Sequence, residues 1–101
     1  MIRDGYYIGA DLKFQIEIAA TGFDQHTHRY TIDFYCGDSH LHFDQDDVIS
    51  HDGKFYLPVP TDQLSPGRMR TVTTAYVPDS DFESGYRREI AVTDLNIVKH
   101  I

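Results

Sequence analysis

Short runs in which apolar and polar residues alternate recur along the whole chain. Every second residue is apolar from Leu12 to Ile18, and the pattern returns over Ile32–Cys36 and Phe55–Val59. Successive side chains of a β-strand point to opposite faces, so each run predicts a strand with one buried and one solvated face. Turn residues separate most of the runs. This spacing predicts a small antiparallel sandwich or barrel.

Length and charge limit the classes of function. The 101 residues fit one domain, residues 1–101, with a single core. Nine Lys and Arg residues stand against 16 Asp and Glu residues, which gives a formal net charge of −7. Binding to nucleic acid needs a concentrated positive face, so we expect no nucleic-acid partner. A partner protein with a basic surface suits this negative charge better than a nucleic acid does.

The single cysteine and the lack of long apolar stretches indicate the cellular compartment. Cys36 is the single cysteine, so an intrachain disulfide is excluded and a reducing compartment is favoured. The first residues lack the apolar stretch of a secretory signal, and no stretch reaches the length of a membrane span. We expect assembly in a cytoplasm and no membrane contact.

A hairpin is predicted over residues 30–36 and 39–43, with Gly37-Asp38 as its tight turn. A two-residue loop sets a register that keeps apolar pairs on the inner face and polar pairs on the outer face. The predicted pairs are Ile32 with Phe43, Phe34 with Leu41, Asp33 with His42, and Tyr35 with His40.

The remaining strands follow from the same alternation. The strand over residues 68–77 is expected to bury Met69, Ala75 and Val77. In the last strand the apolar phase slips between Val92 and Leu95, which predicts a β-bulge near Thr93-Asp94. Other strands are expected over 6–8, 11–20, 54–59 and 86–99, loops over 21–29, 44–53 and 78–85, and one 3₁₀ turn within 61–67.

Two histidine pairs raise the hypothesis of a metal site. The pairs His26/His28 and His40/His42 are each predicted to place two imidazoles on one strand face, with Asp33 beside His42. This spacing alone is weak evidence, and solvent-exposed histidines on a hairpin explain it equally simply. We favour that explanation and predict neither a metal nor any other cofactor.

The other chemical candidates have structural explanations. Cys36 lies in the inward phase of its strand, which favours a buried thiol over a nucleophile. Neither acidic cluster fits the calcium-binding loop of an EF-hand, so we expect solvated loops with helix caps and Asx-turns. The clusters are Asp44, Asp46 and Asp47, and then Asp79, Asp81 and Glu83.

Aromatic and arginine side chains are the best candidates for a binding surface. Tyr and Arg are enriched at the energetic centres of protein interfaces. Contacts are also expected from the loops over residues 44–52 and 78–85. The candidate interface residues are Tyr56, Arg68, Arg70, Tyr76, Phe82, Tyr86, Arg87 and Arg88.

Three segments carry a resemblance to a known family. They are residues 74–89 (TAYVPDSDFESGYRRE), residues 9–14 (GADLKF), and residues 52–56 (DGKFY) before Ser65-Pro66-Gly67. Together they resemble small immunoglobulin-like virion proteins, the capsid auxiliary and head-fibre modules of crAss-like and related Bacteroidales tailed phages. The resemblance implies an all-β fold, an immunoglobulin-like antiparallel β-sandwich of about seven strands.

The resemblance also implies a role. It suggests a structural virion protein without catalytic residues, a decoration subunit bound to the major capsid protein or an adaptor for a head fibre. Its location would be the virion, with other virion proteins and self-association as further partners. Three alternatives stay open: a carbohydrate- or protein-binding module, a tail or baseplate adaptor, and a metal-dependent protein built on the histidine pairs.

Overall fold

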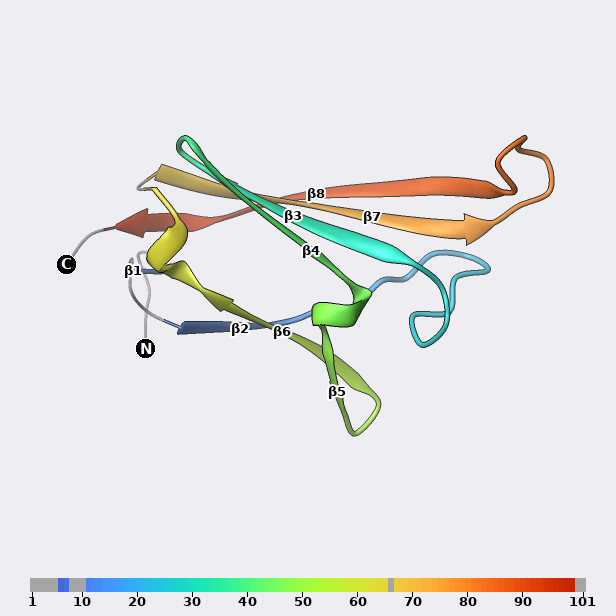
Figure 1. The fold of residues 1–101 in the computed structure, drawn as a ribbon, viewed down its shortest axis with the longest axis horizontal. Coiled ribbons are helices and arrows are strands. Elements are labelled where there is room, and N and C mark those ends of the chain that lie inside the picture. The colour runs from blue at the N-terminus through green and yellow to red at the C-terminus, as the bar shows by residue number, and fades with distance from the viewer. Residues whose placement is uncertain (1–5, 8–10, 66, 100–101) are drawn as a thin grey trace.

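Two β-sheets pack face to face in the computed structural model, which describes residues 6–7, 11–65 and 67–99. The larger sheet has the strand order β1-β8-β7-β3-β4 and the smaller sheet the order β2-β6-β5 (Figure 1). The strands are β1 Tyr6–Tyr7, β2 Asp11–Gln15, β3 Tyr30–Cys36, β4 Ser39–Asp44, β5 Ile49–His51, β6 Lys54–Pro60, β7 Gly67–Pro78 and β8 Tyr86–Lys99, with 3₁₀ turns η1 Gln45–Asp47 and η2 Thr61–Gln63.

The strand order is that of an immunoglobulin sandwich. In such a fold, strands G, F, C and C′ are neighbours in one sheet, and strands B, E and D are neighbours in the other. If β2 to β8 are lettered B, C, C′, D, E, F and G in chain order, both sheets have these neighbours. All neighbouring strands pair antiparallel except β1, which pairs parallel with the end of β8. The expected all-β sandwich is confirmed.

The predicted β3–β4 hairpin is confirmed with its register. Phe34 lies opposite Leu41 and Asp33 lies opposite His42. Gly37 has a φ of 58°, a conformation that a glycine reaches without strain and that the first central residue of a tight hairpin turn needs. Turn chemistry and alternation agree here, so the sequence specifies this hairpin strongly.

The core lies between the sheets, where β3 faces β6. The inward side chains of β3 are almost fully buried, as are Leu57 and Val59 of β6, and Met69, Ala75 and Val77 of β7 are buried as predicted. Phe14 and Phe34 touch across the gap with ring centroids 5.5 Å apart. The other core residues are Tyr30, Ile32, Cys36, Leu57, Val59 and Leu64.

The strand expected over residues 11–20 is shorter than predicted, because β2 ends at Gln15. The reason is that the Gln25 side chain forms hydrogen bonds with backbone groups that a strand partner would otherwise bind. The Gln25 amide nitrogen donates to the carbonyl of Ile16 at 2.9 Å, and its oxygen accepts from the amide of Ile18 at 3.1 Å. Phe23 of the same connection packs against the core.

The loop expected over residues 44–53 was wrong in part, since the chain forms η1 and then β5 there. Asp44 caps η1, and its carboxylate accepts from the amide of Asp46 at 2.8 Å. Asp52 and Gly53 have φ values of 51° and 77°, which is the type I′ pattern of a two-residue hairpin. All three residues of β5 are exposed. A strand without a buried face needs no alternation of apolar and polar residues, so the sequence carries no signal for it.

The predicted bulge in β8 and the predicted short first strand are both found. Arg68 pairs with Ile97 and Arg70 with Asp94, so one extra residue of β8 lies between Asp94 and Ile97. This is the predicted β-bulge, placed just after Thr93-Asp94. The short strand expected over residues 6–8 appears as Tyr6–Tyr7, and Ile8 lies outside the described residues.

Candidate binding surface

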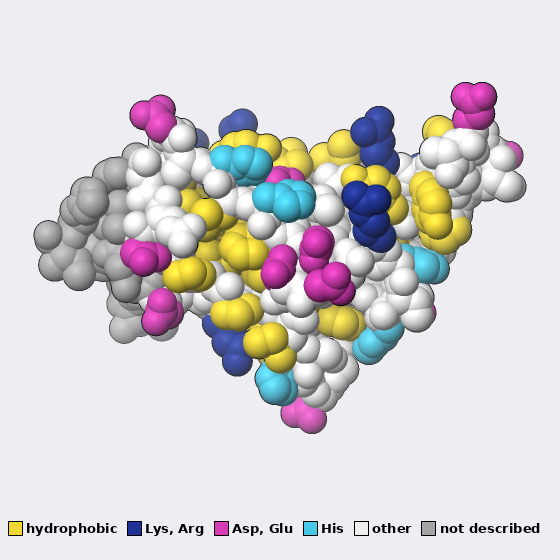
Figure 2. Space-filling model, in the orientation of Figure 1, with side chains coloured by type: hydrophobic (Ala, Val, Ile, Leu, Met, Phe, Trp, Pro, Cys, Tyr) yellow, Lys and Arg dark blue, Asp and Glu magenta, His cyan; other side chains and the backbone are white. Residues whose placement is uncertain are grey.

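The side of the large sheet that faces away from the small sheet carries most of the candidate residues. We call it the outer face. Because Met69, Ala75 and Val77 of β7 point inward, the alternate residues Arg70, Val72, Thr74 and Tyr76 point outward. Figure 2 looks along the gap between the sheets, and its upper edge, over the large sheet, carries both apolar and basic side chains.

Two apolar side chains of β8 stand out on this outer face. Ile90 is 59% exposed and Val92 is 58% exposed, the highest values among the large hydrophobic residues described. Ile90 lies opposite Thr74 and Val92 opposite Val72. The two side chains therefore form one apolar strip beside Val72.

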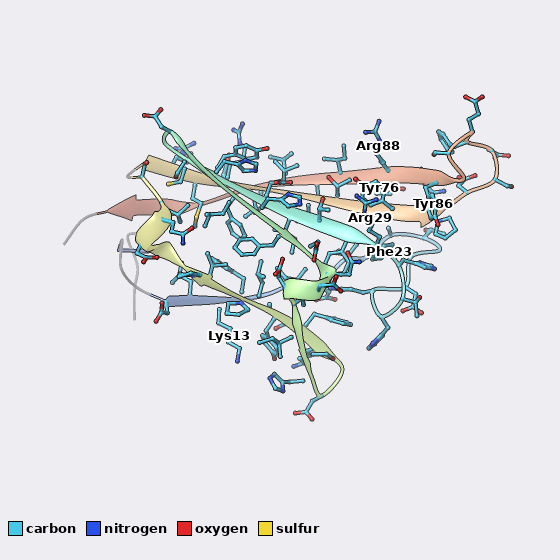
Figure 3. All side chains as sticks on the ribbon, viewed as in Figure 1. Lys13, Phe23, Arg29, Tyr76, Tyr86 and Arg88 are labelled. Carbon is cyan, nitrogen blue, oxygen red and sulfur yellow. The ribbon has the colours of Figure 1, made fainter. Side chains whose placement is uncertain are left out.

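An aromatic and arginine group borders this strip. The Arg29 guanidinium lies over the ring of Tyr76, 4.4 Å from its centroid, and Arg88 lies opposite Tyr76 on β8. In Figure 3 Arg88 points away from the small sheet, above β8. We call the five residues Val72, Tyr76, Arg88, Ile90 and Val92 the outer patch.

The other end of the outer face is polar. Arg70 Nε donates to Asp94 Oδ1 at 3.1 Å, and Tyr35, Arg68 and these two residues border a shallow hollow of about 230 Å³. The Tyr35 ring stacks flat on the ring of His40, with 4.5 Å between centroids. The outer face therefore has an apolar end and a charged end.

A carboxylate joins the two histidines of β4. His40 Nε2 and His42 Nδ1 lie 2.8 Å and 2.7 Å from the same oxygen of Asp33. Burial raises the pKa of Asp33, but hydrogen bonds from His42 and His40 outweigh it and hold the pKa below its usual range. The predicted pairing of Asp33 with His42 is confirmed, and His40 joins it.

The first histidine pair does not share a strand face, so that expectation was wrong. His26 and His28 lie in the connection before β3. The His28 ring faces Phe23, while the His26 ring lies against Phe55 with centroids 4.8 Å apart. Among the described residues, no group of three or more His, Cys, Asp and Glu side chains is arranged to hold a metal ion.

Arg87, one of the candidate interface residues, bonds to groups of the protein's own chain. Its guanidinium donates to Asp79 at 2.6 Å, to Glu89 at 2.9 Å and to the carbonyl of Thr21 at 3.0 Å. The hydrogen bonds that it donates to Glu89 and Asp79 raise its pKa. Arg87 therefore clamps the β7–β8 loop to the connection after β2.

The second acidic cluster has a structural role in the same loop. The Asp79 carboxylate accepts from the amide of Asp81 at 3.0 Å, which closes an Asx-turn. This backbone hydrogen bond, with help from Arg87, lowers the pKa of Asp79. In Figure 2 the first acidic cluster gathers in the middle of the view, over η1, with histidines above it over β4. Both clusters show the caps and Asx-turns that we expected.

The structure brings five of the eight candidate interface residues to the outer face: Arg68, Arg70, Tyr76, Tyr86 and Arg88. Phe82 is 49% exposed in the β7–β8 loop. Tyr56 lies on the small sheet, with Lys13 Nζ 5.1 Å from its ring centroid. Lys13 points away from the large sheet in Figure 3, so Tyr56 belongs to a different surface.

Sequence reasoning missed Ile90 and Val92 as surface residues. Both phases of β8 mix charged and apolar side chains, since Arg88 shares a phase with Ile90 and Glu89 shares one with Ala91. The sequence therefore carried no signal that separates the two phases, because Arg87 and Glu89 make the other phase as charged as that of Arg88.

Comparison with known proteins leaves the structure as the main guide. No family model, curated protein or solved structure matches this chain. Within the described residues, no helix has the length and apolar character that crossing a membrane requires.

Proposed function

We propose that this chain is a non-enzymatic structural protein that docks onto another protein through the outer patch. The observation that carries the proposal is the exposure of Ile90 and Val92, two neighbouring β-branched side chains, beside Tyr76 and Arg88. Small soluble domains rarely leave contiguous apolar strips uncovered unless they bind something there. Tyr and Arg next to such a strip are typical of interface centres.

The proposed partner is the capsid of a tailed phage. The sequence resemblance to capsid auxiliary and head-fibre modules supports this choice, together with a fold whose strand order is that of an immunoglobulin sandwich. The chain would assemble in the host cytoplasm and act in the virion, as a decoration subunit or a head-fibre adaptor. Its net charge of −7 favours a basic partner surface around the apolar strip.

A tagged pull-down from infected or prophage-induced cells tests the proposal. The wild-type protein should retain a major capsid protein, identified by mass spectrometry. The double substitution Ile90→Thr with Val92→Thr should reduce recovery by about tenfold or more, since truncating central interface residues costs more than ~1 kcal/mol each.

The matched control is Ile49→Thr, which alters an exposed isoleucine of β5 on the small sheet. It should leave recovery unchanged. Equal recovery by the wild-type protein and the double variant would refute the outer patch as the docking site. Recovery of tail, baseplate or portal proteins would move the location, and recovery of no virion protein would refute the virion role.

A second candidate function is carbohydrate binding. Tyr35 is 44% exposed beside the hollow bordered by Arg68, Arg70 and Asp94, and aromatic rings next to polar groups are common in ligand sites. A glycan array separates the two candidates. Retention of a specific sugar, abolished by Tyr35→Ala, would favour the carbohydrate module over the decoration subunit.

A further inference from the structure

Strand β8 has a long edge that the described strands leave unpaired. β7 pairs with one edge of β8 along its length, while β1 meets the other edge only at Val98 and Lys99. From Tyr86 to Ile97, none of the described strands pairs with that other edge. Proteins usually protect an edge of this length, because its unpaired N–H and C=O groups attract other strands.

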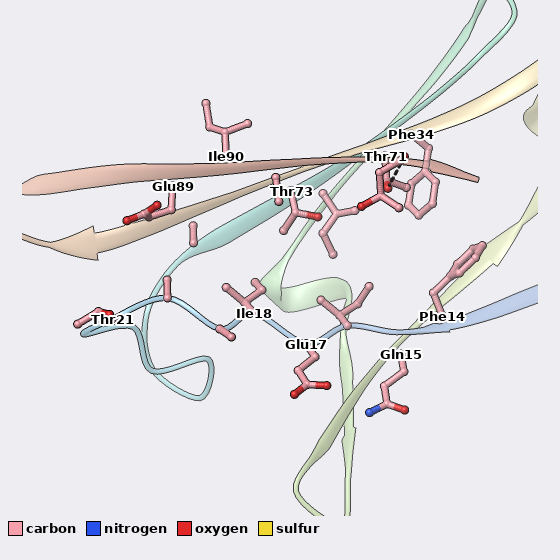
Figure 4. Close-up of a pocket in the computed structure, with 17 residues that line it drawn as sticks. Phe14, Gln15, Glu17, Ile18, Thr21, Phe34, Thr71, Thr73, Glu89 and Ile90 are labelled. Carbon is pink, nitrogen blue, oxygen red and sulfur yellow. Dashed lines mark hydrogen bonds between the residues drawn. The ribbon is translucent and has the colours of Figure 1, made fainter.

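A cavity of about 590 Å³ opens directly beside this edge. Figure 4 shows it between the chain that carries Phe14, Ile18 and Thr21 on one side and β7 and β8 on the other. Its apolar lining includes Ile16, Ile32 and Phe34, all from the core or its border. Ala91 and Thr93 of β8 line it from above and are exposed.

The cavity exists because the two sheets differ in width. The small sheet has three strands against five, and its outermost strand, β2, ends at Gln15. Beyond Gln15 the Ile16 amide donates once more to β6, at the Phe55 carbonyl, and the chain is then held by the Gln25 side chain. No described strand of the small sheet therefore covers the inner side of β8.

We infer that this groove is a binding site for an extended strand of a second polypeptide. A strand added to the free edge of β8 would satisfy the unpaired backbone groups from Tyr86 onward. Its alternate side chains would point into the cavity, because side chains of a strand alternate between its two faces. The added strand would complete the sandwich on its open side.

The negative charge of the protein indicates which kind of strand would bind in the groove. Glu17 is exposed at the rim of the cavity and makes no ion pair within the described residues, while Glu89 is bound by Arg87. With a net charge of −7, a second copy of this chain meets a repulsive surface. The occupant is therefore a segment of another protein, with apolar residues at every second position and Lys or Arg beside them.

Selection from a displayed library of random ten-residue peptides tests this inference. Peptides enriched on the full chain should alternate apolar residues and carry Lys or Arg. Ala91→Trp, which places an indole in the cavity, should weaken their binding by about tenfold or more. Ile49→Thr, which alters β5 of the small sheet away from the cavity, should leave their binding unchanged.

Two further measurements keep the inference falsifiable if Ala91→Trp does not fold. An enriched peptide should shift the amide NMR signals of residues 86–97 in the wild-type protein, and sedimentation should show a monomer without peptide. No enrichment, enriched peptides that ignore the cavity variant, or shifts confined to the outer face would overturn the inference. So would a dimer with protected β8 amides, which would assign the groove to a second copy.

The groove and the outer patch lie on opposite faces of β8, so each can fail without the other. Ala91→Trp should spare the capsid pull-down, which separates a failure of the groove from a failure of the outer patch.

Discussion

Strands β3 and β8 belong to the same sheet, and each carries apolar side chains two residues apart, yet their environments are opposite. Ile32, Phe34 and Cys36 on the inner face of β3 are each 1% exposed. On β8, the inner-face residues Ala91 and Thr93 are exposed, and the outer-face residues Ile90 and Val92 are 59% and 58% exposed. β3 pairs on both edges and lies over β6, while β8 pairs along most of its length on one edge only.

The difference shows that burial in this protein depends on the width of the opposing sheet. A strand over the small sheet is covered on its inner side and forms core. A strand beyond the small sheet keeps both sides open, whatever its hydrophobicity. β8 is therefore the strand best placed to bind other proteins, on its outer face and at its free edge.

Matched isoleucine truncations are the strongest way to break this comparison. Ile32→Ala should lower the free energy of unfolding by about 2–5 kcal/mol, because it leaves a cavity in the packed core. Ile90→Ala should change it by less than about 0.5 kcal/mol, because its side chain already lies in solvent. Urea denaturation of both variants measures the difference, and equal losses would refute the contrast between the strands.

Neighbouring arginines sharpen the comparison within β8 itself. Arg87→Ala should loosen the β7–β8 loop, because it removes the hydrogen bonds to Asp79, Glu89 and the carbonyl of Thr21. Amide exchange at Asp81 and Gly85 should accelerate. Arg88→Ala is the control and should leave these amides unchanged, since Arg88 lies on the outer face. The same acceleration in both variants would contradict the clamp.

The smallest expected effect concerns Asp33 on the outer face of β3. Its pKa lies below the ordinary value of 3.8, so its carboxylate stabilises the fold above that pH and loses this effect as the pH falls through the lowered pKa. Asp33→Asn should cost a few tenths to about 1 kcal/mol near neutral pH. Denaturation at several pH values should show the cost vanishing in acid; a cost that grew with acidity would contradict this assignment.

Local patterns in the sequence predicted much of the fold. The β3–β4 hairpin, the inward face of β7 and the bulge in β8 each follow from alternation and turn residues within a short segment. The early end of β2 could not be predicted, because a side chain ten residues away, Gln25, replaces the strand partner. β5 was missed because all three of its residues are exposed.

The candidate surface was less predictable for a related reason. Tyr76, Arg68 and Arg70 share a face by their phase in β7, which the sequence shows directly. Ile90 and Val92 are exposed because they lie on the outer face, whereas the exposure of Ala91 and Thr93 on the inner face depends on where β2 ends. The role of Arg87 depends on the carbonyl of Thr21, 66 residues away in the chain.

Native-state hydrogen exchange of the isolated protein tests most directly whether β8 is a free strand. The amides of Ile32 and Phe34 should exchange only through global unfolding. Within residues 89–93 of β8, the amides that point to the free edge should exchange orders of magnitude faster than the alternate amides bonded to β7. Uniform protection along β8, equal to that of β3, would show that its edge is already covered and would contradict the account.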